Sequence, residues 1–214
     1  MIFLNLKTYK EATGEKAVKL LSSIKKIKTK TKIIPAVQAT DIYRIKKELG
    51  IEVWAQHVDP IDEGRGTGYI SAFSLREAGA AGVLINHSEH KLEKEAIILA
   101  VKKAKENNLK TLLIGHSFSM LLDFDTWPVD FLAYEKERLI GGEVSVIKEQ
   151  GEIISKLTKR LKHPLIVGAG IKSGEDVKKT LLFGAKGVLL SSHFVKAKSP
   201  EEKLKELSLP FENF

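Results

Sequence analysis

Short apolar runs recur along the chain, and each is followed by a polar loop and then by apolar positions at helical spacing. The runs predict eight strands: IFLNL (2–6), KIIPA (32–36), EVWAQ (52–56), GVLIN (82–86), TLLIG (111–115), VDFLAYE (129–135), PLIVG (164–168) and GVLLS (187–191). Helical spacing is found between or after these runs, at residues 14–28, 92–107, 146–161, 174–183 and 200–208. The chain is therefore expected to alternate strand and helix throughout.

This alternation continues without a linker or a shift in composition, which predicts one domain over residues 1–214. Eight strand–helix units indicate an α/β fold in which parallel strands close into a (β/α)8 barrel. An open, doubly wound sheet is the alternative, but its first loop is usually glycine-rich, whereas here that loop reads KTYKEATGE. The chain has 214 residues against about 250 in a typical barrel, so we expect brief helices after the second, third and fifth strands.

Two of the predicted loops are long enough to suggest a role of their own. Residues 57–73, HVDPIDEGRGTGYISAF, carry charges and glycines with little periodicity. Residues 136–145, KERLIGGEVS, have an apolar tip at Leu139-Ile140 between charged and glycine segments. We interpret the second loop as a lid that excludes water from a neighbouring site.

Composition narrows the class of protein. The chain has no cysteine, which excludes disulfides and cysteine metal sites and makes a reducing cytoplasm the expected setting. No stretch approaches the about 20 apolar residues of a membrane span. The N-terminal apolar run is interrupted at Asn5, which is too early for a signal peptide.

The formal net charge is +8, and the lysines are spread through the predicted helices. We interpret most of them as solvated helix faces. Two alternatives remain: the excess charge steers a small anionic substrate, or it forms a stripe that binds nucleic acid. Aromatic residues are sparse for stacking on bases, so we expect no nucleic acid as a partner. Because no apolar stretch is long enough to span a membrane, we expect no membrane partner either.

The candidates for chemistry are the residues that end the strands, because active sites of (β/α)8 barrels lie at the carboxyl ends of their strands. The first strand ends at Asn5-Leu6-Lys7. Alternation places Asn5 and Lys7 on one face with Phe3, toward the mouth of the barrel. Taken alone, Lys7 also fits a lysine that merely extends from a strand end into solvent.

The fourth strand ends at Asn86-His87-Ser88. Alternation places His87 on one face with Val83 and Ile85, and Ser88 is a residue type that caps the helix expected immediately after it. A helix N-terminus disfavours imidazolium, and a neutral ring can donate a hydrogen bond to a carbonyl oxygen. A single histidine at such a position is also commonly structural.

The sixth strand ends at Glu135, on the same face as Phe131 and Ala133. A carboxylate at the end of an apolar strand is partly desolvated, and we expect this to raise its pKa toward that of a useful general base. The lid candidate follows at once, which suits a reaction with a fragile carbanionic intermediate.

The last two strands end in GAGIKSGED (168–176) and LLSSHF (189–194). Small residues there allow backbone N–H groups and helix N-termini to approach an oxyanion, as in the phosphate site common to such barrels. Turns that enter a helix use Gly and Ser as well, so this pattern alone does not distinguish a phosphate site from ordinary helix starts.

Six short fragments stand at strand ends or in the loops that follow. They are Asn5-Leu6-Lys7, Ala55-Gln56, Gly66-Thr67-Gly68, Asn86-His87-Ser88-Glu89, Ala133-Tyr134-Glu135 and Leu139-Ile140-Gly141. In this order, and with GAGI at 168–171, they resemble triosephosphate isomerase, in particular its short archaeal branch, over essentially the whole chain. The resemblance implies a TIM barrel enzyme of glycolysis and gluconeogenesis that interconverts glyceraldehyde 3-phosphate and dihydroxyacetone phosphate through an enediolate.

The resemblance also implies a role for each matching residue. Glu135 is similar to the general base, His87 to the neutral electrophile and Lys7 to the cation that stabilises the enediolate. Glu89 resembles a buried carboxylate that supports the lysine. The substrate-binding residues implied are Asn5, Leu6, Lys7, Ile140, Gly141, Gly170, Ser191 and Ser192, and those from Ile140 onward would hold the phosphate. Neither a metal nor an organic cofactor is implied.

The loop at 57–73 has a meaning in the family as well. In relatives its tip inserts beside the active site of a neighbouring subunit, and Thr67 matches that tip. The resemblance therefore implies a homodimer at least, with a tetramer as the alternative.

The lid and the phosphate loop depart from the family pattern. Lys136 stands where the family has proline, Gly142 and Glu143 stand where its hinge ends in Thr-Gly, and His193 replaces a glycine. Losing a proline or gaining a glycine costs about 0.4–1 kcal/mol each in ordering a loop. We therefore expect weaker lid closure than in relatives that keep the proline.

Two other functions fit parts of the sequence. Another phosphate-binding barrel isomerase or synthase of biosynthesis would share the site after the last two strands, but it does not predict Lys7, His87 and Glu135 together. A non-catalytic barrel that binds nucleic acid would use the lysines, and its binding would collapse steeply with salt.

Overall fold

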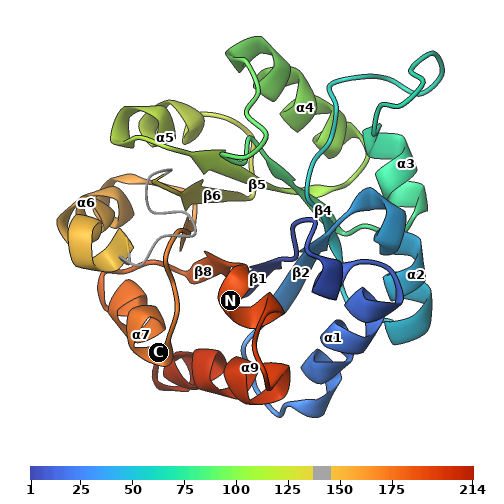
Figure 1. The fold of residues 1–214 in the computed structure, drawn as a ribbon. Coiled ribbons are helices and arrows are strands. Elements are labelled where there is room, and N and C mark those ends of the chain that lie inside the picture. The colour runs from blue at the N-terminus through green and yellow to red at the C-terminus, as the bar shows by residue number, and fades with distance from the viewer. Residues whose placement is uncertain (137–145) are drawn as a thin grey trace.

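The computed structural model describes residues 1–136 and 146–214, with the side chains of residues 146–150 and 213 outside the description. The strands are β1 Ile2–Asn5, β2 Ile33–Val37, β3 Trp54–Ala55, β4 Gly82–Ile85, β5 Lys110–Gly115, β6 Phe131–Tyr134, β7 Leu165–Val167 and β8 Gly187–Leu190. Each pairs in parallel with its neighbour in sequence, and β8 pairs with β1, so the sheet closes into a barrel (Figure 1). The expected α/β class and closed (β/α)8 barrel are confirmed.

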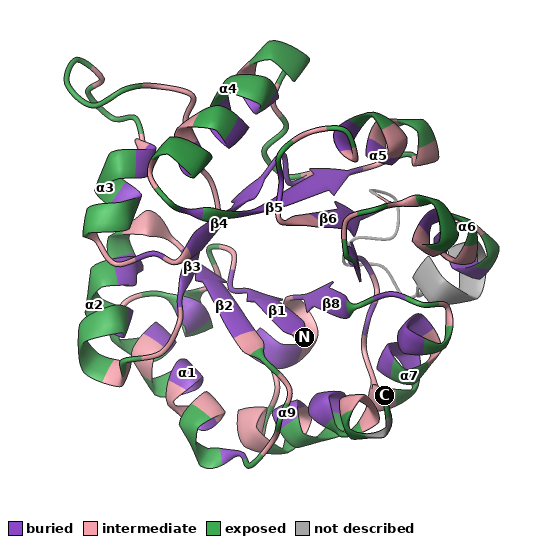
Figure 2. Cartoon of the chain, turned by 180° about the vertical axis from the view of Figure 1, so that it is seen from behind, coloured by how far each residue is buried: buried purple, intermediate pink, exposed green. Residues whose placement is uncertain are grey.

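The helices ring the barrel and turn their buried faces toward the strands (Figure 2). They are α1 Glu15–Lys26, α2 Ala39–Leu49, α3 Ala72–Glu77, α4 Lys94–Glu106, α5 Phe118–Phe124, α6 Val146–Arg160, α7 Gly174–Leu182, α8 Ser192–Val195 and α9 Pro200–Ser208, with short 3-10 turns at Lys10–Ala12 and Leu209–Asn213. The expectation of brief helices holds for α3 and α5, with 6 and 7 residues, but is wrong for α2, which has 11. Two of the strands are also short, since β3 has 2 residues and β7 has 3, and this contributes to the short chain.

Side chains that alternate along the strands fill the interior of the barrel. They are Phe3, Ile34, Ala36, Trp54, Leu84, Leu112, Ile114, Ala133, Ile166 and Leu189. Phe3 packs edge-on against Trp54, with ring centroids 5.1 Å apart. The indole fits because Gly82 has no side chain, since a Cβ there would lie 2.5 Å from the ring. This packed layer forms the floor beneath the strand ends.

Of the predicted loop 57–73, residues 57–71 project outward between β3 and α3, and residues 72–73 already belong to α3 (Figure 1). Asp59 closes the base of this loop, because its carboxylate accepts the Ile70 N–H at 2.7 Å and its own N–H donates to the Ile70 carbonyl at 2.9 Å. Thr67 is exposed near the tip. In the described ranges, every helix is too short or too polar to cross a membrane.

Candidate active site

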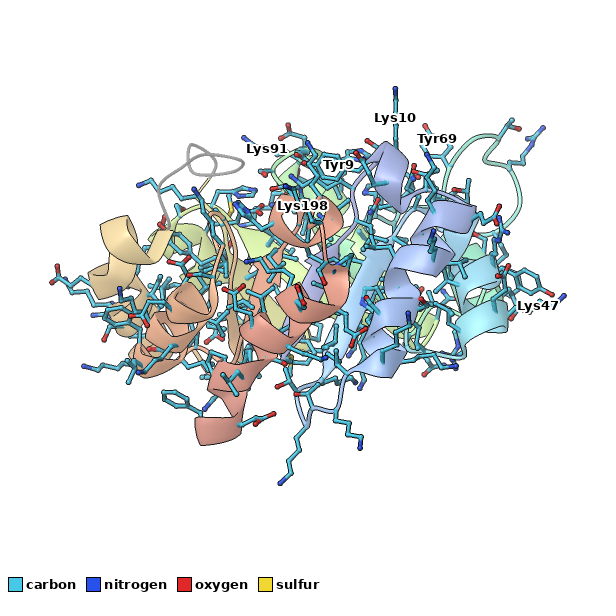
Figure 3. The ribbon with its side chains drawn as sticks, turned by 60° about the horizontal axis from the view of Figure 1, so that its bottom comes forward. Tyr9, Lys10, Lys47, Tyr69, Lys91 and Lys198 are labelled. Carbon is cyan, nitrogen blue, oxygen red and sulfur yellow. The ribbon has the colours of Figure 1, made fainter. Side chains whose placement is uncertain are left out.

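A cavity opens at the carboxyl ends of the strands. It is lined by Asn5, Lys7, Tyr9, His87, Glu135, Ala169, Gly170, Ile171, Leu189, Leu190, Ser191, Ser192 and His193. The three expected catalytic residues therefore share one space with most of the expected binding residues. Tyr9, labelled near the top of the view in Figure 3, is one of these lining residues. Leu6 is placed differently, because its side chain is fully buried in the layer between strands and helices.

Lys7 reaches the cavity from the end of β1 in a left-handed backbone conformation, with a φ of 47°. Its N–H donates to Asn5 Oδ1 at 3.0 Å, and its carbonyl accepts from Gln56 Nε2 at 3.1 Å. Lys7 Nζ lies 2.6 Å from Glu89 Oε1, and the lysine side chain is only 16% exposed. The ammonium is thus held in the cavity rather than extended into solvent.

Glu89 supports Lys7 as expected, but it does so from the surface. Its side chain is 53% exposed, so the expectation of a buried carboxylate is wrong. The reason is local: residues 88–93 form a turn and irregular structure before α4 instead of its first helical turn, and Glu89 lines a hollow that adjoins the mouth, with Lys7 and His90. An ion pair this exposed contributes little to stability, and its main effect is to orient the ammonium.

His87 reaches the cavity by a different route from the expected one. Val83 and Ile85 pack outward against the helices, and Leu84 points into the barrel interior. Strict alternation would therefore turn His87 outward, and the expectation that it shares a face with Val83 and Ile85 inside the barrel is wrong. β4 ends at Ile85, and Asn86 takes a φ of 63°, which breaks the alternation and returns His87 to the mouth.

The backbone sets which nitrogen of the His87 ring carries hydrogen. The Glu89 N–H donates to Nδ1 at 3.1 Å, so the neutral ring carries its hydrogen on Nε2. Nε2 is buried, has no hydrogen-bond partner among the described residues, and lies 3.4 Å from Glu135 Oε1. Helix α4 begins only at Lys94, so the expectation of a helix N-terminus beside this ring is wrong.

Glu135 follows β6 directly and is 3% exposed. The Ser88 hydroxyl donates to its Oε2 at 3.1 Å. Burial raises the pKa of this carboxyl, but the neighbouring His87 ring, Ser88 and the charge of Lys7 outweigh burial and leave the pKa below its usual value. The expectation of a raised pKa is therefore wrong. Glu135 is an ionised carboxylate at neutral pH, with its partners already in place.

Two residues that hold this site together were missed by the sequence analysis. Ser88 was interpreted as a helix cap, and Gln56 appeared only within a motif. Gln56 Nε2 donates to the carbonyls of Lys7 and Ala36, each at 3.1 Å, and so ties the ends of β1 and β2 to β3. Ser88 and Glu135 are 47 residues apart, and no local pattern reports a contact over that separation.

The other end of the cavity is suited to an oxyanion. Ala169 and Gly170 have φ values of 68° and 69°, so the chain turns sharply after β7. Ser191 Oγ is buried and has no hydrogen-bond partner among the described residues. Gly170 has no side chain, and those of Ser191 and Ser192 are small, which leaves room beside the backbone as an oxyanion site requires.

Two lysines, Lys172 and Lys203, and one carboxylate, Asp176, act on this end of the cavity, so the positive charges are in excess. His193 lines the cavity, and burial together with the charges of Lys172 and Lys203 lowers the pKa of its ring. Such a potential attracts an anion. The expected phosphate-binding residues Ile140 and Gly141 lie outside the described residues, as do the departures at Gly142 and Glu143, while Lys136 lies within them.

Metal ligands do not gather in the part of the chain that the structure describes: no group of three or more His, Asp or Glu residues there could hold an ion. The polar groups of the cavity are an ammonium, a neutral imidazole, a buried carboxylate and an oxyanion cradle. Fold and site together define a class, a (β/α)8-barrel enzyme equipped for acid–base chemistry on a small anionic substrate.

The family model for triosephosphate isomerase matches residues 1–207. The triosephosphate isomerase of Methanothermus fervidus is 38% identical over 214 residues, covering 97% of this chain and 96% of that relative. That of Saccharolobus solfataricus is 37% identical over 212 residues, covering 96% and 93%. The chain belongs to the triosephosphate isomerase family. Both relatives are archaeal, in agreement with the expected branch.

A crystal structure of triosephosphate isomerase from Bartonella henselae matches the fold with a TM-score of 0.74. It is 22% identical to this chain, and the match covers 99% of this chain and 97% of that one. This likeness supports the barrel. Family membership makes the chain an isomerase, in place of the biosynthetic synthase or nucleic-acid-binding barrel that the sequence left as alternatives.

Proposed function

We propose that the chain interconverts glyceraldehyde 3-phosphate and dihydroxyacetone phosphate in this cavity, with Lys7, His87 and Glu135 as its catalytic residues. The observation that carries the proposal is the buried carboxylate of Glu135, 3.4 Å from the hydrogen-bearing Nε2 of His87. In a substrate with an H–C–C=O unit, a base and a neutral donor this close together can act at the same time. The base removes the proton from carbon, and the donor forms a hydrogen bond to the adjacent carbonyl oxygen. Lys7 lines the same cavity and brings a positive charge to it.

The reaction then follows from these three groups. Glu135 removes a proton from the carbon beside the carbonyl, while His87 Nε2–H donates to the carbonyl oxygen, which becomes the enediolate oxygen. The ammonium of Lys7 offsets the negative charge that develops there. His87 moves a proton between the two enediolate oxygens, and Glu135 returns its proton to the neighbouring carbon. Asn5 acts indirectly, since its Oδ1 holds the backbone of Lys7.

The phosphate of the substrate is assigned to the opposite end of the cavity. The support there is the small lining residues Gly170, Ser191 and Ser192, and the buried Ser191 hydroxyl that has no partner among the described residues. Ile140 and Gly141 are added from the resemblance alone. Preorganised donors of this kind require neither metal nor organic cofactor for the enediolate step.

The assembly is proposed to be a homo-oligomer, a dimer at least, that works in the cytoplasm. Thr67 is exposed near the tip of the projecting loop, where a second copy could cover it. Residues 1–214 are proposed to fold as one domain, because β1 and β8 pair and the two ends of the chain share one barrel.

The test of the proposed function is a direct assay of the purified chain. We expect it to convert glyceraldehyde 3-phosphate to dihydroxyacetone phosphate at the same rate before and after treatment with a chelator. Absence of isomerisation would contradict the function. Loss of activity on chelation, restored by a divalent cation, would contradict the expectation that no metal takes part.

Replacing Ser88 by alanine is expected to shift the acid limb of kcat/KM to higher pH. Glu135 acts as a base only when ionised, and its pKa lies below the usual 4.5, so the enzyme loses this base only as pH falls through that lowered value. The Ser88 hydroxyl contributes to the lowering, and removing it raises the pKa. The measurement is the ratio of kcat/KM for variant and parent against pH, in which titration of the substrate cancels.

The control for this shift is Ser23→Ala, which removes a buried hydroxyl bonded to the Leu20 carbonyl at 2.6 Å, far from the cavity. A ratio that stays flat with pH for Ser88→Ala would show that the Ser88 hydroxyl does not tune the base. The contribution of Glu135 to the free energy of unfolding falls with decreasing pH, as the activity does. Because the folded pKa of Glu135 is depressed, its contribution is present above the unfolded pKa and is lost as pH falls through the folded value.

Gly168→Ala is expected to lower kcat about tenfold, because small displacements of a reacting group cost catalysis steeply. A Cβ at Gly168 would lie 3.3 Å from Glu135 Oε1, so the carboxylate must shift by a few tenths of an ångström. The matched control is Gly151→Ala in α6, which presses on the Phe183 ring at 2.8 Å and should change only stability. Steady-state kinetics and thermal melts on both variants check this, and equal kcat values would refute it.

A further inference from the structure

His116 lies immediately after β5, behind the residue proposed as the base. Its Nδ1 is 3.2 Å from the backbone carbonyl oxygen of Glu135. A carbonyl only accepts, so Nδ1 carries the hydrogen and donates. His116 does not line the catalytic cavity, and its ring faces a separate hollow between α4 and α5 that Ser117 and Phe124 also line. The residue therefore touches the base without reaching the substrate.

The backbone of Glu135 needs this donor because the strand ladder ends there. The Glu135 N–H donates to the Gly115 carbonyl at 3.1 Å, which is the last rung between β5 and β6. In a regular parallel ladder the Glu135 carbonyl would next accept from the N–H two residues beyond Gly115, that of Ser117. Ser117 instead begins the turn into α5 as its N-cap, with its hydroxyl accepting from Met120 N–H at 3.2 Å. The imidazole of His116 takes the place of the missing rung.

The same strand end also holds the other side of the site. Asn86 Nδ2 donates to the Ile114 carbonyl at 3.0 Å, and Asn86 is the residue whose backbone turns His87 toward the mouth. The end of β5 thus braces His87 through Ile114 and Glu135 through His116.

We propose that His116 is a positioning residue, which fixes the backbone of Glu135 and thereby aims its carboxylate at the carbon that loses the proton. This rests on the proposed role of Glu135 as the base. The His116 ring is held on one side only, since its Nε2 is buried and has no hydrogen-bond partner in the described part of the chain. The single bond to Glu135 is therefore the polar contact by which it acts.

The experiment compares His116→Leu with His116→Asn. Leucine removes the donor, whereas the amide nitrogen of asparagine stands the same number of bonds from Cα as Nδ1 and restores it. We expect His116→Leu to lower kcat about tenfold with KM little changed, because the base is misaimed while binding is intact. His116→Asn is expected to keep most of kcat. If leucine prevents folding, His116→Gln displaces the donor by one atom and should show the same loss.

The matched control is His163→Leu. His163 is also partly buried and bonded through Nδ1, to Asp125 Oδ1 at 2.8 Å, just before β7 at the opposite end of the barrel from the cavity. Its loss should lower the melting temperature and leave kcat unchanged. A fall in kcat that is equal in His116→Leu and His163→Leu, or equal in His116→Leu and His116→Asn, would overturn the proposal. So would a rise in KM at constant kcat.

A double-variant cycle separates this inference from the role of Glu135 itself. If His116 acts through Glu135, then His116→Leu should have no further effect on kcat when Glu135 is already glutamine. A full additional loss in that background would overturn the positioning role. If Glu135→Gln alone kept full activity, the proposed base would be wrong whatever His116 did. If His116→Leu alone kept full activity, only the present inference would fail.

Discussion

Replacing Glu135 by glutamine is expected to lower kcat by about 10³- to 10⁴-fold, at the upper end of what one general base contributes. Glutamine keeps the shape of the side chain and can still accept from Ser88, but it cannot take a proton from carbon. The residues proposed to bind the phosphate are unchanged in this variant, so KM should change little. The loss belongs to the chemical step.

The measurement is steady-state isomerisation in both directions, with exchange of the substrate C–H proton with solvent as a second readout. Glu52→Gln is the matched control. Glu52 is partly buried and bonded to Lys32 at 2.7 Å and to the Trp54 indole at 3.0 Å, but it lies outside the cavity. We expect that variant to keep its kcat. Proton exchange that continues in Glu135→Gln would place the base elsewhere.

Replacing Lys7 by methionine is expected to lower kcat/KM by about 10²- to 10³-fold, the usual effect of removing one group that stabilises developing negative charge. Methionine fills much of the volume of the lysine stem, so the change removes the ammonium with little loss of packing. Glu89 is left without its partner, but it is 53% exposed and water replaces the ion pair at little cost to stability. Both kcat and KM should worsen, since the cation also attracts the substrate.

Lys103→Met is the control for this change, because the Lys103 side chain is 17% exposed against 16% for Lys7. Lys103 is paired with Asp62 of the projecting loop and with Glu106 of its own helix, and it does not line the cavity. Its loss should leave the kinetics as they were. If the two variants behaved alike, the positive charge of Lys7 would have no special part in the reaction, and general attraction of the anion would explain its effect.

The pKa of Glu135 bears on how this site works. A carboxylate with a lowered pKa is a weaker base than the desolvated one expected from the sequence, but it is fully ionised and already oriented. His87, which lies 3.4 Å away and lines the cavity, and Ser88, which donates to its Oε2, hold this carboxylate in place. With Glu135 as the proposed base, placement of the groups contributes more to catalysis than the strength of the base.

The sequence predicted the strands well because their signal is local. A short apolar run after a helical pattern indicates a strand wherever it occurs, and the last residue of the run marks the carboxyl end of that strand. Lys7 and Glu135 were predicted correctly to reach the cavity. Regular alternation along β6 accounts for Glu135, whereas Lys7 follows β1 in a left-handed conformation that the sequence pattern did not predict. The prediction that His87 reaches the cavity was correct, but the reason given for it, a shared face with Val83 and Ile85, was wrong. Asn86 breaks the alternation with a positive φ.

What the sequence determined by itself is the order and spacing of eight strand ends and the kinds of side chain that follow them. Tertiary structure alone decided how those side chains are held. Ser88 became a partner of Glu135 instead of a helix cap, Glu89 stayed at the surface, and His116 took up a ladder position that the backbone left empty. The physical reason is that hydrogen-bond partners and burial depend on which strand ends become neighbours when the barrel closes, and that pairing joins residues far apart in the chain.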